Sequence, residues 1–196
     1  MSFLQAVDEE AAGGEVAVIY ERDIERMGYL PNYTRTFSLH PGAYEAWRHL
    51  IAAIAKPMDE RRYELATVGA AARLRSSYCS LAHGKTLNDK FFESSDLRKI
   101  VEGAAGSVLD EVDRLIVELA ERVVDDATTV TAADIELLRS AGLTDREIFD
   151  VILAAAARSF FSKVLDATGT LADSVYNELD PDLLETLTVG RRIAPR

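Results

Sequence analysis

The residues best suited to chemistry lie between positions 64 and 83, where the chain's single cysteine, Cys79, precedes His83 by four residues. Residues four apart share one face of a helix, so a helical segment would bring these two side chains within contact range. The thiolate is the reactive form of cysteine, and it is favoured near a helix N-terminus or a protonated histidine. The spacing therefore indicates a primed thiol that could attack a peroxide and become a sulfenic acid.

Glu64 is the third candidate. On a helix its side would be shared by Val68 and Ala71, whereas Arg62 and Arg73 would point the other way. We expect this carboxylate to face inward and to accept and donate protons near neutrality.

Each of the three residues also has an ordinary structural interpretation. Free cysteines are commonly small buried side chains, and a single histidine or glutamate on a helix is often a core or ion-paired residue. Spacing alone leaves both interpretations open.

Helix signals surround these candidates. Helices expected over about residues 59–74 and 77–88 carry the motif on a helical pair within about 59–90, the second beginning near Ser76 or Ser77. Gly14 precedes a helix to about Met27, with Gly28 as its left-handed C-cap, and a further helix begins at Pro41 and ends at Pro57.

The second half of the chain shows the same signals. Apolar residues recur every three or four positions from Leu109 to Val124, with Asp113 expected on the polar side. Capping pairs open two helices, Thr131 with Asp134 and Thr144 with Glu147, and a short helix follows Asp180. The helix after Thr144 is apolar on nearly all sides from Phe149 to Ala157, which predicts a place at the bundle centre or in a subunit interface.

Composition narrows the class of protein. The 196 residues are 48% hydrophobic and 28% charged, typical of a chain that folds, and this length predicts a single domain over residues 1–196. The net charge of −11 argues against nucleic acid and anionic membranes as partners, and the apolar run 151–157 is too short to span a bilayer. One cysteine cannot form an internal disulfide, so we expect a cytoplasmic location.

No cofactor is expected from the sequence. His40 and His49 lie far from Cys79 and His83, which leaves a zinc site short of ligands. No glycine-rich phosphate loop follows a strand, so nucleotides and flavins are not expected either.

The stretch from Glu64 to His83, E-L-A-T-V-G-A-A-A-R-L-R-S-S-Y-C-S-L-A-H, resembles the signature of the alkylhydroperoxidase D-like and carboxymuconolactone decarboxylase superfamily. In that signature a glutamate precedes a helix-opening Cys-x-x-Cys, and a histidine follows the second cysteine by four positions. Glu64, Cys79 and His83 match these three positions. The turn 28–32, His40-Pro41 and Ala46-Trp47 resemble the uncharacterised peroxidase-related branch, so that the resemblance covers residues 14 to 170.

The sequence departs from the signature at its first cysteine, which is Ser76 here. A serine hydroxyl can hydrogen-bond to a thiolate but cannot resolve a sulfenic acid, so the family's internal disulfide cannot form. Tyr78 stands where some relatives carry a histidine, which removes another proton carrier.

The resemblance implies an all-α helical bundle of about six to eight helices that assembles into homo-oligomers. It implies an antioxidant oxidoreductase that reduces hydrogen peroxide or organic hydroperoxides. Cys79 would be the nucleophile, His83 and Glu64 the proton relay, and Ser76 a hydrogen-bond donor, with an external thiol as reductant. Two alternatives stay open: a decarboxylase-like lyase or isomerase that uses Glu64 and His83 without the thiol, and a non-catalytic relative.

Overall fold

The computed structural model describes residues 2–195, and over that range it contains ten α-helices, four short 3₁₀-helices and no β-strand. The all-α prediction is confirmed. The α-helices are α1 (Glu15–Met27), α2 (Asn32–Phe37), α3 (Pro41–Ala55), α4 (Glu60–Arg73), α5 (Ser77–Lys90), α6 (Ser94–Val101), α7 (Glu111–Asp126), α8 (Ala132–Ser140), α9 (Asp145–Ala167) and α10 (Pro181–Leu187).

The predicted helix boundaries follow from local capping. Gly28 ends α1 with φ of 79°, a left-handed conformation that costs glycine little. Thr131 and Thr144 each form a full capping box with the acidic residue three positions on, at the start of α8 and α9. Such signals are visible in sequence because cap and partner are neighbours along the chain.

The expected number of six to eight helices is wrong, because α2 and α6 were missed. Helix α2 has six residues and lies partly in the segment expected to be a turn, while α6 has eight. Helices this short show little periodicity and are marginal in isolation, so tertiary contacts decide them. For α2 such a contact is present, because the Asn32 amide donates to the distant Asp173 carboxylate at 2.8 Å.

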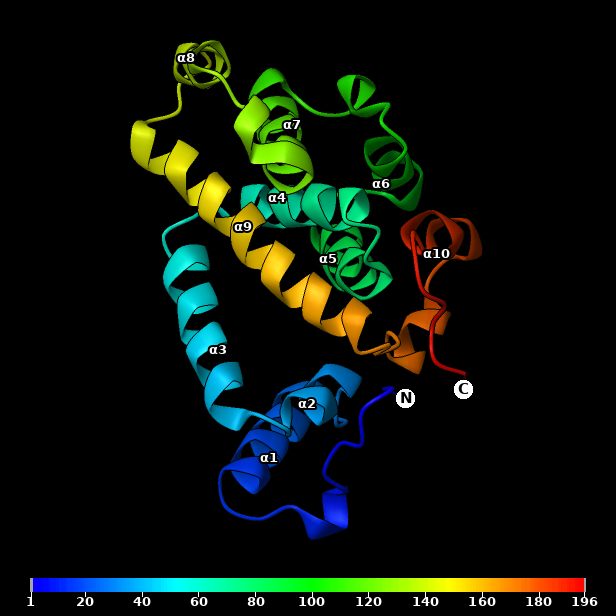
Figure 1. The fold of residues 1–196 in the computed structure, drawn as a ribbon. Helices are drawn as coiled ribbons and strands as arrows, with labels where there is room; N and C mark the ends of the chain where they lie inside the picture. Colours follow the sequence, from blue (N-terminus) through cyan, green and yellow to red (C-terminus); the bar gives the residue numbers. More distant parts are fainter. Residues whose placement is uncertain (1, 196) are drawn as a thin grey trace.

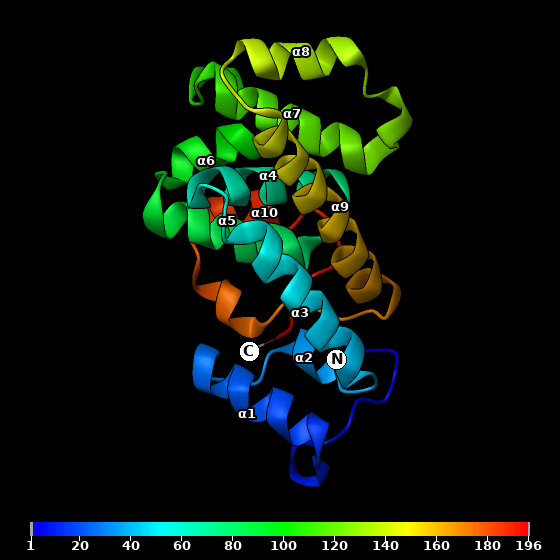
Figure 2. The same cartoon turned by 90° about the vertical axis from the view of Figure 1, so that its left-hand side faces the viewer.

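Helix α4 forms the centre of the bundle, where it packs against α5, α7 and α9 (Figure 1). All nine of its residues from Tyr63 to Ala71 are buried. Small residues allow neighbouring helices to come close, and a Cβ on Gly69 would lie 3.0 Å from the Val117 side chain on α7. In both views α1 and α8 lie at opposite ends of the molecule (Figure 2).

Helix α9 crosses the bundle and, with α4, contributes to all three hydrophobic clusters of the core. Its buried face includes Val151, Ala155 and Leu165, whereas Phe149 and Phe160 remain exposed on the other side. The predicted position of α9 at the bundle centre is therefore confirmed for one face of the helix, and the other face is exposed. Over the described range, no helix combines the length and apolar character needed to cross a membrane.

Asp113 belongs to the polar side of α7, as expected, but it is not exposed to solvent. Its side chain is buried and forms ion pairs with Arg61 at 2.6 Å and Arg62 at 3.5 Å. The polar stripe of α7 meets the start of α4 here, so the carboxylate is covered by guanidinium groups rather than by water. Arg62 is thereby turned away from Glu64, as the sequence predicts.

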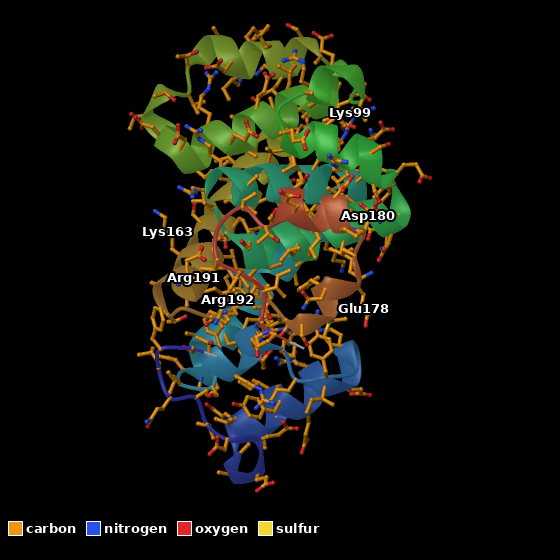
Figure 3. The ribbon with its side chains drawn as sticks, turned by 90° about the vertical axis from the view of Figure 1, so that its right-hand side faces the viewer. Lys99, Lys163, Glu178, Asp180, Arg191 and Arg192 are labelled. Carbon is orange, nitrogen blue, oxygen red and sulfur yellow. The ribbon has the colours of Figure 1, made fainter. Side chains whose placement is uncertain are left out.

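The C-terminal segment holds the start of α5 in place. The Gly190 amide donates to the Ser77 hydroxyl at 2.8 Å, and Arg191 donates to the Asp166 carbonyl at the end of α9 at 2.8 and 3.1 Å. Figure 3 shows Arg191 and Arg192 on the segment that runs back beside α9. The close approach at Gly190 leaves no room for a side chain, because a Cβ there would lie 1.9 Å from the Arg75 carbonyl oxygen.

We predict that Gly190→Ala lowers the free energy of unfolding by about 2 kcal/mol, since the new methyl group would force two backbone segments apart. Urea denaturation measures the change. Gly13→Ala is the matched control, because open space surrounds Gly13, and it should stay within about 0.5 kcal/mol of wild type. Equal stability of the two variants would show that the C-terminal segment is not packed on the α4–α5 turn.

Candidate functional site

A cavity of about 630 Å³ lies beside α4, α5 and α9, and α1 and α3 also contribute to its wall. Glu64 from α4 and both Cys79 and His83 from α5 line it. The volume falls in the range typical of small-molecule sites. The three sequence candidates therefore share one cavity.

Cys79 is the third residue of α5, within the first turn, where the unpaired backbone amides favour negative charge. The residue is 1% exposed. Its sulfur accepts two hydrogen bonds from α9, one from the Ser162 hydroxyl at 3.2 Å and one from Nη1 of Arg158 at 3.6 Å. Both donors are groups that the sequence did not place in the site.

Arg158 is 3% exposed, although it carries a charge. Its Nη2 donates to the Tyr63 hydroxyl at 3.4 Å, and its guanidinium lies over the Phe161 ring. Within residues 2–195 it forms no ion pair with a carboxylate, and its Nε has no hydrogen-bond partner. Burial acts to lower the pKa of Arg158, but nearby Cys79, Tyr63 and Glu64 outweigh it and hold that pKa above its ordinary value.

Glu64 and His83 form a pair in which Oε2 of the carboxylate lies 2.6 Å from Nδ1 of the ring. Glu64 is 8% exposed, so the predicted inward orientation is confirmed. Burial lowers the pKa of His83, and the charge of Arg158 lowers it further, while Glu64 opposes both only in part. The imidazole is therefore neutral at pH 7. Its Nδ1–H donates to the carboxylate, which leaves the Nε2 lone pair free to take a proton.

Cys79 and His83 line the same cavity but do not form the direct pair that the sequence predicted. No hydrogen bond joins them over the described range; instead each has a partner from another helix, α9 for the thiol and α4 for the ring. The same range holds no cluster of three or more His, Cys, Asp or Glu residues arranged to bind a metal ion.

Ser76 lies apart from this arrangement. It is the N-cap residue of α5 and is fully buried, but it does not line the cavity. In the described structure its hydroxyl makes no hydrogen bond to Cys79, His83 or Glu64. We therefore give it no part in the function proposed below.

The remaining wall of the cavity is largely aromatic. Trp47 and Phe161 stack with ring centroids 4.0 Å apart. Six tyrosines also line the cavity, namely Tyr29, Tyr33, Tyr44, Tyr63, Tyr78 and Tyr176. Such a wall favours an organic ligand with apolar or aromatic surface.

Two buried carboxylates fix this wall. Asp173 accepts hydrogen bonds from the hydroxyls of Tyr78 and Tyr29, and burial raises the pKa of Tyr78 well above its ordinary value. Asp23 accepts from the Tyr44 hydroxyl at 2.6 Å. The tyrosine hydroxyls are therefore held as hydrogen-bond donors and do not ionise near neutrality.

Arg158 and Ser162 are the site residues that sequence reasoning missed, although a signal for them exists. Val151, Ala155, Arg158, Ser162 and Leu165 follow one another at helical spacing on the buried face of α9. A single arginine within such a stripe must be buried with a partner, and that partner lies on another helix. The sequence could therefore have indicated a buried arginine in α9, but not which residues it contacts.

The arrangement of helices defines the class of this protein: the chain has the alkylhydroperoxidase D-like fold. No protein-family model matches the sequence, and no curated protein matches it. The fold assignment therefore rests on solved structures.

One similar structure is the alkylhydroperoxidase AhpD core of an uncharacterised peroxidase-related protein from Ralstonia eutropha JMP134. It has 18% identity and a TM-score of 0.79 and covers 97% of this chain and 98% of its own. A peroxidase-related protein from Silicibacter sp. TM1040 has 20% identity and a TM-score of 0.77, over 89% of this chain and 94% of its own.

A third similar structure is a cysteine-to-alanine variant of the debrominase Bmp8 in complex with 2,3,4-tribromopyrrole. It has 10% identity and a TM-score of 0.75, over 94% of this chain and 97% of its own. At identities of 10 to 20% these likenesses establish the fold, and they extend beyond the residues that carry the sequence resemblance.

The lowered pKa of His83 predicts a pH dependence of stability. Between its ordinary value of 6.5 and the lower folded value, the unfolded chain binds a proton that the folded chain does not. This contribution to stability is complete above pH 6.5 and is lost as the pH falls through that window. We expect His83→Gln to remove it, so that its unfolding free energy falls less steeply on acidification than that of wild type.

Urea denaturation of both proteins at a series of pH values gives the slope of the unfolding free energy against pH for each. Taking the difference between the two slopes cancels the contributions of other titrating groups. His49→Gln, at an exposed position on α3, is the control and should follow wild type. A His83→Gln slope equal to that of wild type would contradict a buried neutral imidazole.

Proposed function

We propose that this protein is a thiol-dependent peroxidase that reduces organic hydroperoxides, with Cys79 as nucleophile. One observation carries the proposal: the Cys79 thiol and the Glu64–His83 pair line the same cavity. Peroxide reduction needs a thiol that can ionise and a group that moves protons, and side chains of both kinds line this cavity. The fold shared with peroxidase-related proteins supports the same function.

The first step oxidises the sulfur. The Cys79 thiolate attacks the terminal oxygen of ROOH, so that an S–O bond forms as the O–O bond breaks. The products are a sulfenic acid and an alkoxide, and the alkoxide takes a proton to become ROH. His83 is the proposed carrier of that proton, which it receives from the thiol or from solvent and holds with the help of Glu64.

The second step needs an external reductant, because the chain has one cysteine. A thiol R′SH attacks the sulfenic acid, which forms a mixed disulfide and releases water. A second R′SH then releases R′SSR′ and restores the Cys79 thiol. Such thiols are kept reduced in the cytoplasm, which is the proposed location.

The proposed substrates are organic hydroperoxides rather than hydrogen peroxide alone. A cavity of about 630 Å³ with an aromatic wall offers apolar contact to the R group of ROOH, which hydrogen peroxide lacks. Turnover should therefore be faster with cumene hydroperoxide than with hydrogen peroxide.

Two other reactions have an observation in their favour. The buried Glu64–His83 pair supports decarboxylation or isomerisation by acid–base chemistry alone. The likeness to a debrominase, together with the aromatic cavity, supports thiol-dependent removal of halogen, with the balance ArBr + 2 R′SH → ArH + R′SSR′ + HBr. A non-catalytic relative is the remaining alternative.

We also propose that the protein forms homo-oligomers through the exposed side of α9. Phe149 and Phe160 are 54% and 47% exposed, and the exposed Ala156 lies between them on the same side of the helix. Large apolar side chains grouped on a surface mark interfaces between proteins. The occupant proposed is a second copy of this chain.

Purified protein should reduce cumene hydroperoxide with a small thiol as electron donor, and Cys79→Ser should fall to the background rate because a hydroxyl cannot be oxidised in this way. His83→Gln and Glu64→Gln should each lower kcat/KM by roughly 10²-fold, the contribution of a positioned proton carrier. His49→Gln is the control and should match wild type. A coupled assay for R′SSR′ measures all four variants.

Other outcomes would assign another function. Equal rates for wild type and Cys79→Ser would remove the thiol from the reaction, and lyase activity that survives Cys79→Ser but not His83→Ala would assign the acid–base alternative. Turnover of a bromoarene without turnover of peroxides would assign dehalogenation. A thiol inert to alkylation at neutral pH, with no turnover, would indicate a non-catalytic protein.

The double substitution Phe149→Glu with Phe160→Glu should lower the molar mass measured by light scattering, since charges on the contact face oppose association. Val18→Glu is the control, because Val18 is 60% exposed and belongs to α1 rather than to α9. A monomeric wild type, or an unchanged mass in the double variant, would contradict the interface.

A further inference from the structure

Arg158 poses a problem of charge compensation. A buried guanidinium needs a nearby anion to offset the loss of hydration. The nearest groups that its nitrogens contact are the Cys79 sulfur at 3.6 Å and the Tyr63 hydroxyl at 3.4 Å. Within residues 2–195 no carboxylate forms an ion pair with it. Of these two kinds of neighbour, a thiol ionises more easily than a phenol, because their ordinary pKa values are about 8.5 and about 10.

The contacts of the sulfur match that role. A guanidinium has hydrogen-bond donors and no acceptor, so Arg158 can only donate to Sγ. The Ser162 hydroxyl also donates to Sγ, at 3.2 Å. Two donors that meet at one sulfur fit a thiolate, which is a strong acceptor, better than a thiol, which is a weak one.

We propose that Arg158 is a catalytic residue: it is the counter-ion that holds Cys79 as a thiolate, and Ser162 is the second donor to that sulfur. This assignment deepens the proposed peroxidase function, and the catalytic role given to Arg158 rests on that function. It gives to α9 the activating role that the sequence assigned to His83.

The other ionisable groups around the sulfur are consistent with this pairing. Glu64 on α4 is bonded to His83, and the lowered pKa of His83 keeps that ring uncharged. Burial raises the pKa of Tyr63 on α4 and of Tyr176 in the segment after α9, so both phenols stay neutral. No residue of α6 or α10 lines the cavity in the described structure. Arg158 is thus the one cation buried beside Cys79 in the described range.

The pairing divides the work of the first step. Arg158 and Ser162 stabilise the charge while it is on the sulfur. As the S–O bond forms, that charge passes to the departing alkoxide. His83 takes up a proton from solvent at Nε2 and passes it to the alkoxide oxygen. Neutral His83 is then free for proton transfer, because it is not needed as the partner of the thiolate.

Alkylation by iodoacetamide tests the assignment without a peroxide, and Cys79 is the sole cysteine that can react. The rate is measured against pH for wild type, Arg158→Met and Arg158→Lys. The wild-type midpoint should lie below about 8.5, the ordinary value for a thiol. Arg158→Met should raise it by at least about one pH unit, and Arg158→Lys should restore most of the difference because it keeps the charge.

Arg146→Met is the matched control on the same helix, since Arg146 is largely exposed and pairs with Asp150, and its midpoint should equal that of wild type. Ser162→Ala should raise the midpoint less than Arg158→Met does. If Arg158→Met does not fold, the wild-type midpoint together with the Arg158→Lys and Ser162→Ala profiles decides.

A wild-type midpoint at or above about 8.5, or coincident profiles for wild type and a folded Arg158→Met, would overturn the assignment. The alkylation midpoint tests the ion pair independently of peroxide turnover, which tests the proposed function. A low midpoint that depends on Arg158, without peroxide turnover, would keep the ion pair and reject the peroxidase. Peroxide turnover with a midpoint that does not change in Arg158→Met would support the peroxidase function and reject the ion pair.

Discussion

One constraint governs the centre of this bundle: a buried charge needs a hydrogen-bond or ionic partner nearby. Apolar side chains around it cannot replace the hydration that it has lost. Glu64 meets this constraint through His83, and Arg158 meets it through the Cys79 sulfur and the Tyr63 hydroxyl. Helix α5 supplies one member of each pair, so its position relative to α4 and α9 fixes both.

Small side chains make that position possible. Ala66, Gly69 and Ala70 on α4 and Ala154 and Ala155 on α9 are all buried, and they let helix backbones approach closely enough for side chains on different helices to meet across one cavity. The tyrosines held by Asp173 and Asp23, which are Tyr29, Tyr78 and Tyr44, then form part of the cavity wall. The chemical groups and the aromatic wall are thus products of the same packing.

The fold by itself does not select a reaction. Structures that share it include uncharacterised peroxidase-related proteins and a debrominase. The candidate site of this chain contains one cysteine, Cys79. Ser76 is the N-cap residue of α5 and does not line the cavity, whereas Arg158 and Ser162 contact the Cys79 thiol.

The sequence alone determined the all-α class, the capped starts of α8 and α9, the glycine end of α1 and the inward orientation of Glu64. Each depends on residues within one or two helical turns of one another, so its physical cause is local. The short helices α2 and α6, the burial of Asp113 between Arg61 and Arg62, and the partners of Cys79 depended on the tertiary structure. Arg158 lies 79 positions from Cys79 along the chain. A contact over that separation is set by how whole helices pack, which the residues near either end do not encode.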